Sequence, residues 1–270
     1  MFTFKFSYVN IVHFKTFTKV VTMKKTVLLS LLTLTLYAKT SLEVAQKSFE
    51  RVSNYKSSLS TTTMILENAS GDKNIRKIEI KKLEGKDGDK SLLTFLYPND
   101  LKGTKLLSYE VIAGDDKQWL YLPAIKRVKR ISSRNKSGSF MASEFSYEDI
   151  ASQNYKNYSY NDLAQEVVVD GKNYFKITRF PKDKNSGYSK QILWIDTTNY
   201  LAHFGEYYDK HKRLLKKIEF LDYVKLDGIY RVHKMVMNNT QNKKRSTLVW
   251  ESDKIGMKLS KKEFSKRALR

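Results

Sequence analysis

Two Asp-Gly pairs constrain the fold of this chain more than any other feature. Each pair stands between two short β-forming runs, at residues 167–169 and 174–177 for Asp170-Gly171 and at residues 223–226 and 229–232 for Asp227-Gly228. An Asp-Gly pair accommodates the positive φ angles of a type I′ turn, which joins antiparallel strands through two residues. The two pairs therefore predict two tight hairpins and an antiparallel sheet.

Most of the remaining chain also has the pattern of strands. Runs rich in β-branched and aromatic residues, bounded by Gly, Pro, Asn and Asp, occupy residues 60–66, 74–83, 90–97, 105–113, 117–122, 192–195, 201–208, 214–220 and 247–251. Together with the hairpins they predict a mainly β (α+β) fold of about ten or eleven antiparallel strands. A sandwich, a closed barrel and an incomplete barrel are all compatible with this pattern.

Capping boxes predict a helix near each end of this sheet. Thr40 with Glu43 precedes apolar residues at helical spacing, and Ser260 with Glu263 precedes a short segment that reaches Leu269. Residues 131–161 lack a strand pattern and contain one further cap, Ser146-x-x-Asp149. A gap of this length inside a compact domain is usually functional or disordered.

The N-terminal residues predict export. From Met23, two lysines precede an eleven-residue apolar or hydroxyl-bearing run over 26–36, and Ala38 offers a small residue for cleavage. The run is shorter than the roughly 20 residues that cross a bilayer. A retained interfacial anchor is the alternative. We therefore interpret residues 1–22 as an over-long start, 23–38 as a signal peptide cleaved after Ala38, and 39–270 as a single periplasmic domain.

Charge and cysteine content limit the classes of partner. After residue 38 the chain has 45 basic and 28 acidic residues, a net charge of +17, and no cysteine. The absence of cysteine excludes disulfides, thiolate metal sites and cysteine nucleophiles. The positive balance serves solubility or favours a polyanionic partner. Because export argues against nucleic acid, the candidates are an anionic membrane surface, lipopolysaccharide or an acidic protein.

No catalytic motif is present, so the sequence predicts a protein that is not an enzyme and has no cofactor. The histidines His203, His211 and His233 are scattered and lack a second ligand at helical spacing, which makes a metal site improbable. Adjacent carboxylates at Glu148 and Asp149 would point in different directions on a helix. We interpret this pair as a solvated helix face with cap contacts rather than as an acid/base couple.

The most specific pattern lies in residues 119–150, WLYLPAIKRVKRISSRNKSGSFMASEFSYEDI. A W-x-Y-L-P strand end, a basic V-x-R-I stretch and an S-F-M-G-S-D-F-S-Y-E-D-like segment follow one another. This order resembles the outer-membrane lipoprotein-sorting protein family, in the LolA-like periplasmic lipoprotein carrier superfamily. Ala142 stands where the family has glycine, and Glu144 where it has aspartate. The P-x-D-x-x-G-T-like turn at 98–104 and segments near 188–196, 207–209 and 264–269 extend the resemblance from about residue 40 to the end.

The resemblance implies a fold and a function. The fold would be a strongly curved, incomplete antiparallel β-barrel, with an N-terminal helix and a helical lid, for which residues 131–161 are the candidate, over the concave face. The function would be that of a carrier or chaperone that binds the acyl chains of a lipid or lipoprotein and moves it through the envelope toward the outer membrane. The resemblance also implies a membrane exporter of the resistance-nodulation-division type as a partner.

Two sets of residues are candidates for this function, each with a simpler alternative. The expected apolar ligand cavity and lid comprise Phe95, Leu107, Trp119, Tyr121, Phe140, Met141, Phe145, Tyr147 and Trp194, any of which could instead fill the β core. The expected strip for anionic head groups comprises Lys126, Arg127, Lys129 and Arg130, which could instead be a solvated surface turn.

Two other functions remain open at this stage. The chain could be a non-enzymatic docking module of an envelope transport complex, without lipid cargo. An envelope hydrolase is the weaker alternative. A connected apolar cavity would favour the carrier over the docking module.

Overall fold

The computed structural model describes residues 38–112 and 114–270. The predicted start and signal peptide therefore lie outside the described residues, apart from Ala38. Residues Thr40–Arg270 form one compact unit, which is described by itself below. In the part of the chain that is described, no helix combines the length and the apolar character that a membrane span requires.

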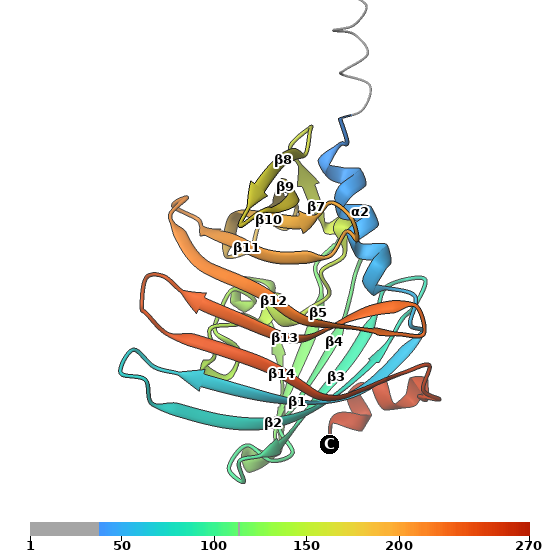
Figure 1. Ribbon diagram of the computed structural model, residues 1–270. Coiled ribbons are helices and arrows are strands. Elements are labelled where there is room, and N and C mark those ends of the chain that lie inside the picture. The colour runs from blue at the N-terminus through green and yellow to red at the C-terminus, as the bar shows by residue number, and fades with distance from the viewer. Residues whose placement is uncertain (1–37, 113) are drawn as a thin grey trace, which may run out of the picture. The chain divides into compact units, whose positions relative to one another are not determined.

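The described residues form an antiparallel sheet of 14 strands (Figure 1). The strands are β1 (Ser57–Glu67), β2 (Lys73–Leu83), β3 (Lys90–Tyr97), β4 (Lys105–Tyr109), β5 (Lys117–Leu122), β6 (Arg127–Ile131), β7 (Tyr158–Tyr160), β8 (Gln165–Val169), β9 (Lys172–Pro181), β10 (Tyr188–Asp196), β11 (Ala202–Asp209), β12 (Leu214–Leu226), β13 (Ile229–Asn239) and β14 (Arg245–Ile255). Their order is β6-β5-β4-β3-β2-β1-β14-β13-β12-β11-β10-β9-β7, and β8 pairs with β9.

Helices are short and begin where the capping residues predict. Helix α2 (Ser41–Val52) starts at a capping box between Thr40 and Glu43, and helix α3 (Tyr147–Ile150) starts at one between Ser146 and Asp149. Short 3₁₀ turns occupy Pro123–Ile125, Ser133–Asn135, Phe140–Ala142, Tyr155–Asn157, Lys261–Phe264 and Lys266–Leu269. The predicted cap at Ser260 thus begins 3₁₀ turns at the C-terminal end.

Both predicted hairpins are confirmed. Asp170 and Gly171 have φ angles of 48° and 75°, and Asp227 and Gly228 have 46° and 87°. The first pair joins β8 to β9 and the second joins β12 to β13. Positive φ angles at both central residues are those of the type I′ turn, so two local signals set two strand registers.

The fold class is confirmed, with corrections to its details. The fold is mainly β. Its sheet is unclosed, because β6 and β7 stand at the two ends of the strand order and do not pair with each other. The expected ten or eleven strands were too few, because the basic stretch itself forms β6 and residues 158–160 form the short β7. Residues 127–131 therefore form a strand and not the surface turn that was the alternative to a head-group strip. The sheet is neither closed nor strongly curled, so the strongly curved form overstated its bending.

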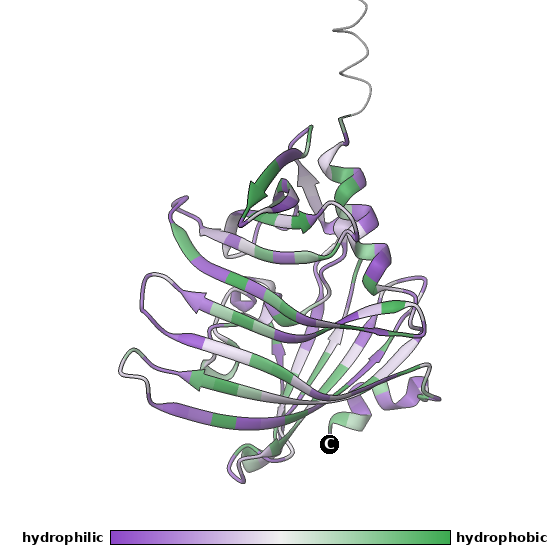
Figure 2. Ribbon diagram, in the orientation of Figure 1, coloured by the Kyte–Doolittle hydropathy of each residue, from purple (hydrophilic) through white to green (hydrophobic). Residues whose placement is uncertain are grey.

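Hydrophilic and hydrophobic residues are mixed along the strands (Figure 2), and successive side chains of a strand point to opposite faces of the sheet. We call the face with Met64, Ile78 and Leu106 the inner face, and the opposite one the outer face. The main core lies on the inner face and also includes Val44 and Ala45 of α2. A second cluster on the outer face joins Leu92, Leu107 and Trp119 to Phe264 and Leu269 of the C-terminal turns. Both faces of β3–β5 are therefore covered.

In the candidate lid, residues 131–161, short turns and helix α3 follow β6 and pack on the inner face, and residues 158–160 form β7. Phe140 and Phe145 are 0% and 1% exposed, so the segment is part of the core. We call residues 143–150 the inner segment.

Ala142 has the left-handed backbone conformation that glycine favours, with a φ of 63°. We expect Ala142→Gly to raise the free energy of unfolding by about 1 kcal/mol, because the exposed methyl group makes no core contact and the strain is removed. Urea unfolding measures the change. The control is Ala151→Gly, since Ala151 has a φ of −71° and should lose stability instead. A loss of stability at both positions would contradict this account.

Candidate functional site: a cavity on the inner face

A cavity of about 360 Å³ lies against the inner face of the sheet. Its walls come from strands β1–β4 and β9–β14, from helix α2 and from the inner segment. Apolar side chains form most of this wall, among them Phe49, Met64, Ile80, Leu93, Leu106, Phe145, Ile195, Ile218, Phe220, Met235 and Trp250. The volume is in the range of small-molecule sites, about 300–1,000 Å³.

One end of the cavity is polar, and the strand register shows why. On the inner face, Ser58 is paired with Lys82, Lys82 with Ser91, and Ser91 with Ser108, so a polar row crosses β1–β4. Two residues further along each strand, the inner-face row is Ser60, Ile80, Leu93 and Leu106. A polar end beside an apolar interior suits an amphiphile, a molecule with a polar head and an apolar chain.

Charged groups at this end have shifted pKa values. Burial, followed by the nearby Glu110 carboxylate, raises the pKa of Asp89 to about 6. Burial, followed by the positive charge of Arg231, lowers the pKa of Lys82. Arg231 itself donates to Asp253 at 2.7 Å and lies 4.5 Å from the centre of the Tyr55 ring. The polar end is therefore only partly hydrated, and its charges act strongly on one another.

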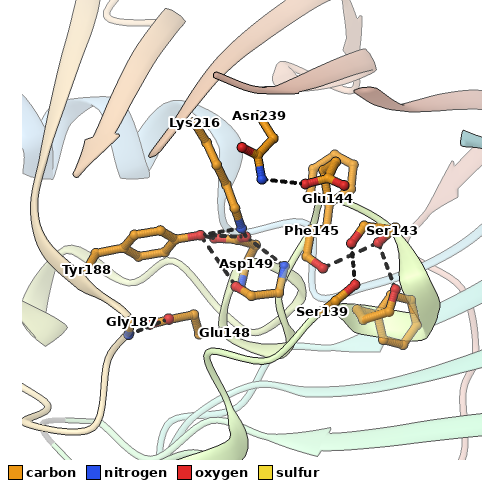
Figure 3. A network of polar contacts seen from close by, with 12 residues as sticks. Ser139, Ser143, Glu144, Phe145, Glu148, Asp149, Gly187, Tyr188, Lys216 and Asn239 are labelled. Atoms are coloured by element: carbon orange, nitrogen blue, oxygen red, sulfur yellow. Dashed lines mark hydrogen bonds and ion pairs between the residues drawn. The ribbon is translucent and has the colours of Figure 1, made fainter. Parts of the chain in front are cut away.

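A buried ion pair ties the inner segment to the sheet (Figure 3). Lys216 Nζ on β12 lies 3.1 Å from Asp149 Oδ2 and donates to the Tyr188 hydroxyl at 2.8 Å. The Tyr188 hydroxyl donates in turn to Asp149 Oδ2 at 2.8 Å. The side chains of Lys216 and Asp149 are 9% and 5% exposed, so their charges depend on each other.

Two further carboxylates hold the same segment. Glu148 accepts from the Gly187 N–H and the Ser186 hydroxyl, both at 2.7 Å, and burial, with the Asp149 charge next, raises its pKa. Glu144 accepts from Asn239 Nδ2 at 2.7 Å. The cap contacts predicted for this pair are confirmed, since Asp149 and Ser146 cap α3, but the helix face is not solvated, because the Glu148 and Asp149 carboxylates are engaged inside the protein. Among the described residues, no group of three or more His, Cys, Asp and Glu side chains is placed to hold a metal ion.

The structure separates the nine residues that the sequence assigned to the cavity or lid. Phe145 lines the cavity. Phe95 and Phe140 lie in the core beside it, with ring centres 5.9 Å apart, and Met141 and Tyr147 pack against that core.

The other four lie elsewhere. Leu107, Trp119 and Tyr121 belong to the outer-face cluster, and Trp194 stacks on Phe204 with ring centres 5.1 Å apart. In each case the inner face is occupied by a neighbour in the sequence, such as Leu106 or Leu120. Successive side chains of a strand point to opposite faces, so a one-residue error moves a residue out of the cavity.

The four basic residues of the expected strip also lie apart from the cavity wall. Lys126 follows the turn at Pro123–Ile125, while Arg127, Lys129 and Arg130 are on β6, an edge strand that pairs with β5. All four are exposed. None forms an ion pair with another described residue, so their charges remain available to a partner.

Sequence reasoning missed Lys82 and Arg231, the cations of the polar end. A signal for Lys82 exists, since it shares the period-two pattern of Ile78 and Ile80 and is thus a lysine on an otherwise apolar face. Arg231 has no comparable signal, because its neighbours in β13 alternate less clearly.

Comparison with known proteins identifies the family. A family model described only as an uncharacterized protein matches residues 87–270. A solved protein domain assigned to outer membrane lipoprotein sorting, from Vibrio parahaemolyticus, is 42% identical, with a TM-score of 0.81, and the match covers 84% of this chain and 97% of that chain. This chain belongs to the outer-membrane lipoprotein-sorting family. The family that the motifs indicated is therefore confirmed.

Two further solved structures are similar to this lipoprotein-sorting family member. A DUF1329 family protein from Desulfovibrio piger is 32% identical, with a TM-score of 0.80 and coverage of 85% of this chain and 98% of that one. A LolA superfamily protein from Nitrosomonas europaea shares the fold, with 20% identity, a TM-score of 0.71 and coverage of 86% and 100%. Among curated proteins, none matches this chain.

Proposed function

We propose that this lipoprotein-sorting family member is a non-enzymatic periplasmic carrier. It binds the acyl chains of a lipid or lipoprotein and moves that cargo toward the outer membrane. The observation that carries the proposal is the cavity of about 360 Å³ with an apolar wall and one polar end. The sorting role assigned to the similar domain from Vibrio parahaemolyticus supports it.

Burial of an acyl chain supplies most of the free energy that micromolar binding requires. Each buried methylene contributes about 0.8 kcal/mol, so about a dozen contribute roughly 10 kcal/mol before the cost of association. Micromolar affinity corresponds to about 8 kcal/mol. Acyl burial with a modest contribution from the head group therefore gives an affinity that still permits release.

Release requires access to the covered cavity. Helix α2 and the inner segment both contribute to its wall, and the inner segment is held by the Lys216–Asp149 ion pair. We propose that movement of this cover, at a membrane or at an exporter of the resistance-nodulation-division type, opens the route for cargo. The cover thus controls access to the cavity, and the polar contacts that hold it, such as the Lys216–Asp149 ion pair, determine how readily it opens.

Saturable uptake of a long-chain acyl probe tests the carrier function. We expect purified residues 39–270 to bind a fluorescent fatty-acid analogue at micromolar concentration and to release it to excess neutral monoacylglycerol. Folded protein that takes up no amphiphile would favour the alternative, a docking module of an envelope complex without lipid cargo.

The basic strip is proposed to guide the carrier to anionic membranes. Changing Lys126, Arg127, Lys129 and Arg130 together to Gln should reduce association with anionic vesicles, because each such cation near the surface contributes about 1 kcal/mol. Association of the unchanged protein should fall as salt rises, since the screening length is only about 8 Å at 0.15 M. Vesicle sedimentation measures both. Uptake of a neutral acyl probe should be unaffected, and loss of uptake with unchanged vesicle binding would contradict the assignment.

A further inference from the structure

We infer that the polar end of the cavity is an oxyanion subsite centred on Lys82, so that the preferred cargo carries an acidic head group. The inference rests on the proposed function, since it concerns the ligand of the same cavity. The chemistry shared by the candidate head groups is an oxyanion, either a carboxylate or a phosphate. The basic strip on β6 was expected to bind such head groups, but it lies apart from the cavity wall.

Lys82 is placed to meet a ligand. It lies on the inner face of β2, between Ser58 of β1 and Ser91 of β3, and it lines the cavity. Its neighbour two residues along the same face is Ile80, so the aliphatic part of the lysine continues the apolar wall while its ammonium group lies at the polar end. With the described residues, Lys82 forms neither an ion pair nor a side-chain hydrogen bond.

Three nearby carboxylates already have other donors, whereas Glu110 accepts from the Asp89 N–H through Oε2 and has no partner for Oε1 among the described residues. Glu84 accepts from the backbone N–H groups of Asn54 and Lys56, at 2.8 and 2.7 Å. Asp89 accepts from the Gly85 N–H at 3.2 Å, and Asp253 accepts from Arg231 at 2.7 Å. Since Lys82 forms no hydrogen bond to any of these described carboxylates, its three ammonium donors remain for a ligand.

Arg231 favours an anion at the same place. Its guanidinium, already paired with Asp253, reaches Ser58 Oγ at the β1 end of the polar row at 3.4 Å, and its charge acts on Lys82. An oxyanion beside Lys82 would lie near two positive charges and relieve their mutual repulsion. Because the site is partly buried, a charge-assisted hydrogen bond there is stronger than one in water.

Three ligands with the same acyl chain test the inference: palmitate, palmitoyl lysophosphatidate and neutral monopalmitoylglycerol. We expect the protein to bind at least one of the two anionic ligands about tenfold or more tightly than the neutral one. A preference for palmitate assigns the subsite to a carboxylate, and a preference for lysophosphatidate assigns it to a phosphate. Equal affinity for all three would overturn the inference while leaving the carrier function intact.

Variants of adjacent lysines localise the effect. Lys82→Gln should remove the preference for the anionic ligand and leave affinity for monopalmitoylglycerol within about twofold. Lys82→Arg should retain the preference, which shows that the charge is what matters. The matched control is Lys81→Gln, because Lys81 lies on the outer face and bonds Glu263 at 2.7 Å. It should leave all three affinities unchanged.

The outcomes separate the two proposals. If Lys82→Gln had a normal unfolding curve but lost affinity equally for all three ligands, Lys82 would shape the cavity and the oxyanion subsite would be overturned. Absence of binding by every ligand to the unchanged protein would instead refute the carrier function.

Discussion

Replacing Lys216 by methionine is expected to lower the free energy of unfolding by about 3–5 kcal/mol. The loss follows from burial, since the Lys216 and Asp149 side chains are 9% and 5% exposed and lie 3.1 Å apart. Methionine fills a similar volume but leaves the Asp149 carboxylate without its positive partner. Chemical unfolding followed by circular dichroism measures the change.

An exposed ion pair provides the control. Lys73 lies 3.8 Å from Glu67 with side chains 60% and 28% exposed, so Lys73→Met should change stability by less than about 1 kcal/mol. Combining Lys216→Met with Asp149→Asn should recover part of the loss, because the uncompensated charge is removed. If Lys216→Met changed the free energy of unfolding as little as Lys73→Met does, the buried pair would not anchor the inner segment.

Replacing Met235 by lysine is expected to weaken binding of a neutral long-chain probe by about tenfold or more. Met235 lies on the inner face of β13, paired with Phe220 and Leu248, and all three line the cavity. A lysine there adds a charge beside the acyl chain, and the bound chain would separate that charge from water. Titration with monopalmitoylglycerol measures the loss.

The matched control is the next residue of the same strand. Val236 is paired with Glu219 and Thr247 and lies on the outer face by alternation, so Val236→Lys should leave probe binding within about twofold. Equal losses in the two variants, each folded by circular dichroism, would place the acyl site somewhere other than this cavity.

The parts of the fold that depend on neighbouring residues could be predicted from the sequence. The two Asp-Gly hairpins and the caps at Thr40 and Ser146 are local, because each is completed by residues within a few positions. The family motifs added the unclosed form of the sheet. The family motif has glycine at position 142, and the structure shows that Ala142 keeps the left-handed backbone that glycine favours.

The assignment of faces could not be predicted in the same way. In β4 and β5 both faces are apolar, because the C-terminal turns bring Phe264 and Leu269 onto the outer face from residues far along the chain. Period-two alternation then gives no sign of which face lines the cavity. Leu107 and Trp119 were therefore included among the cavity residues although they lie on the outer face.

Contacts between polar residues far apart in the sequence could not be predicted either. The carboxylate of Asp149 is neutralised by Lys216, 67 residues later, and the basic residues of Arg127–Ile131 pair as a strand with β5 despite their charge. Neither contact has a local pattern, since both arise when the sheet brings distant segments together.

Native mass spectrometry of this protein, purified from its own cell envelope, is the decisive test of the carrier function. We expect a substantial fraction of the protein to carry one amphiphile and to lose it on activation, and we expect Met235→Lys to reduce the adduct while Val236→Lys does not. Protein that is folded, periplasmic and free of any amphiphile in all three forms would contradict the carrier function.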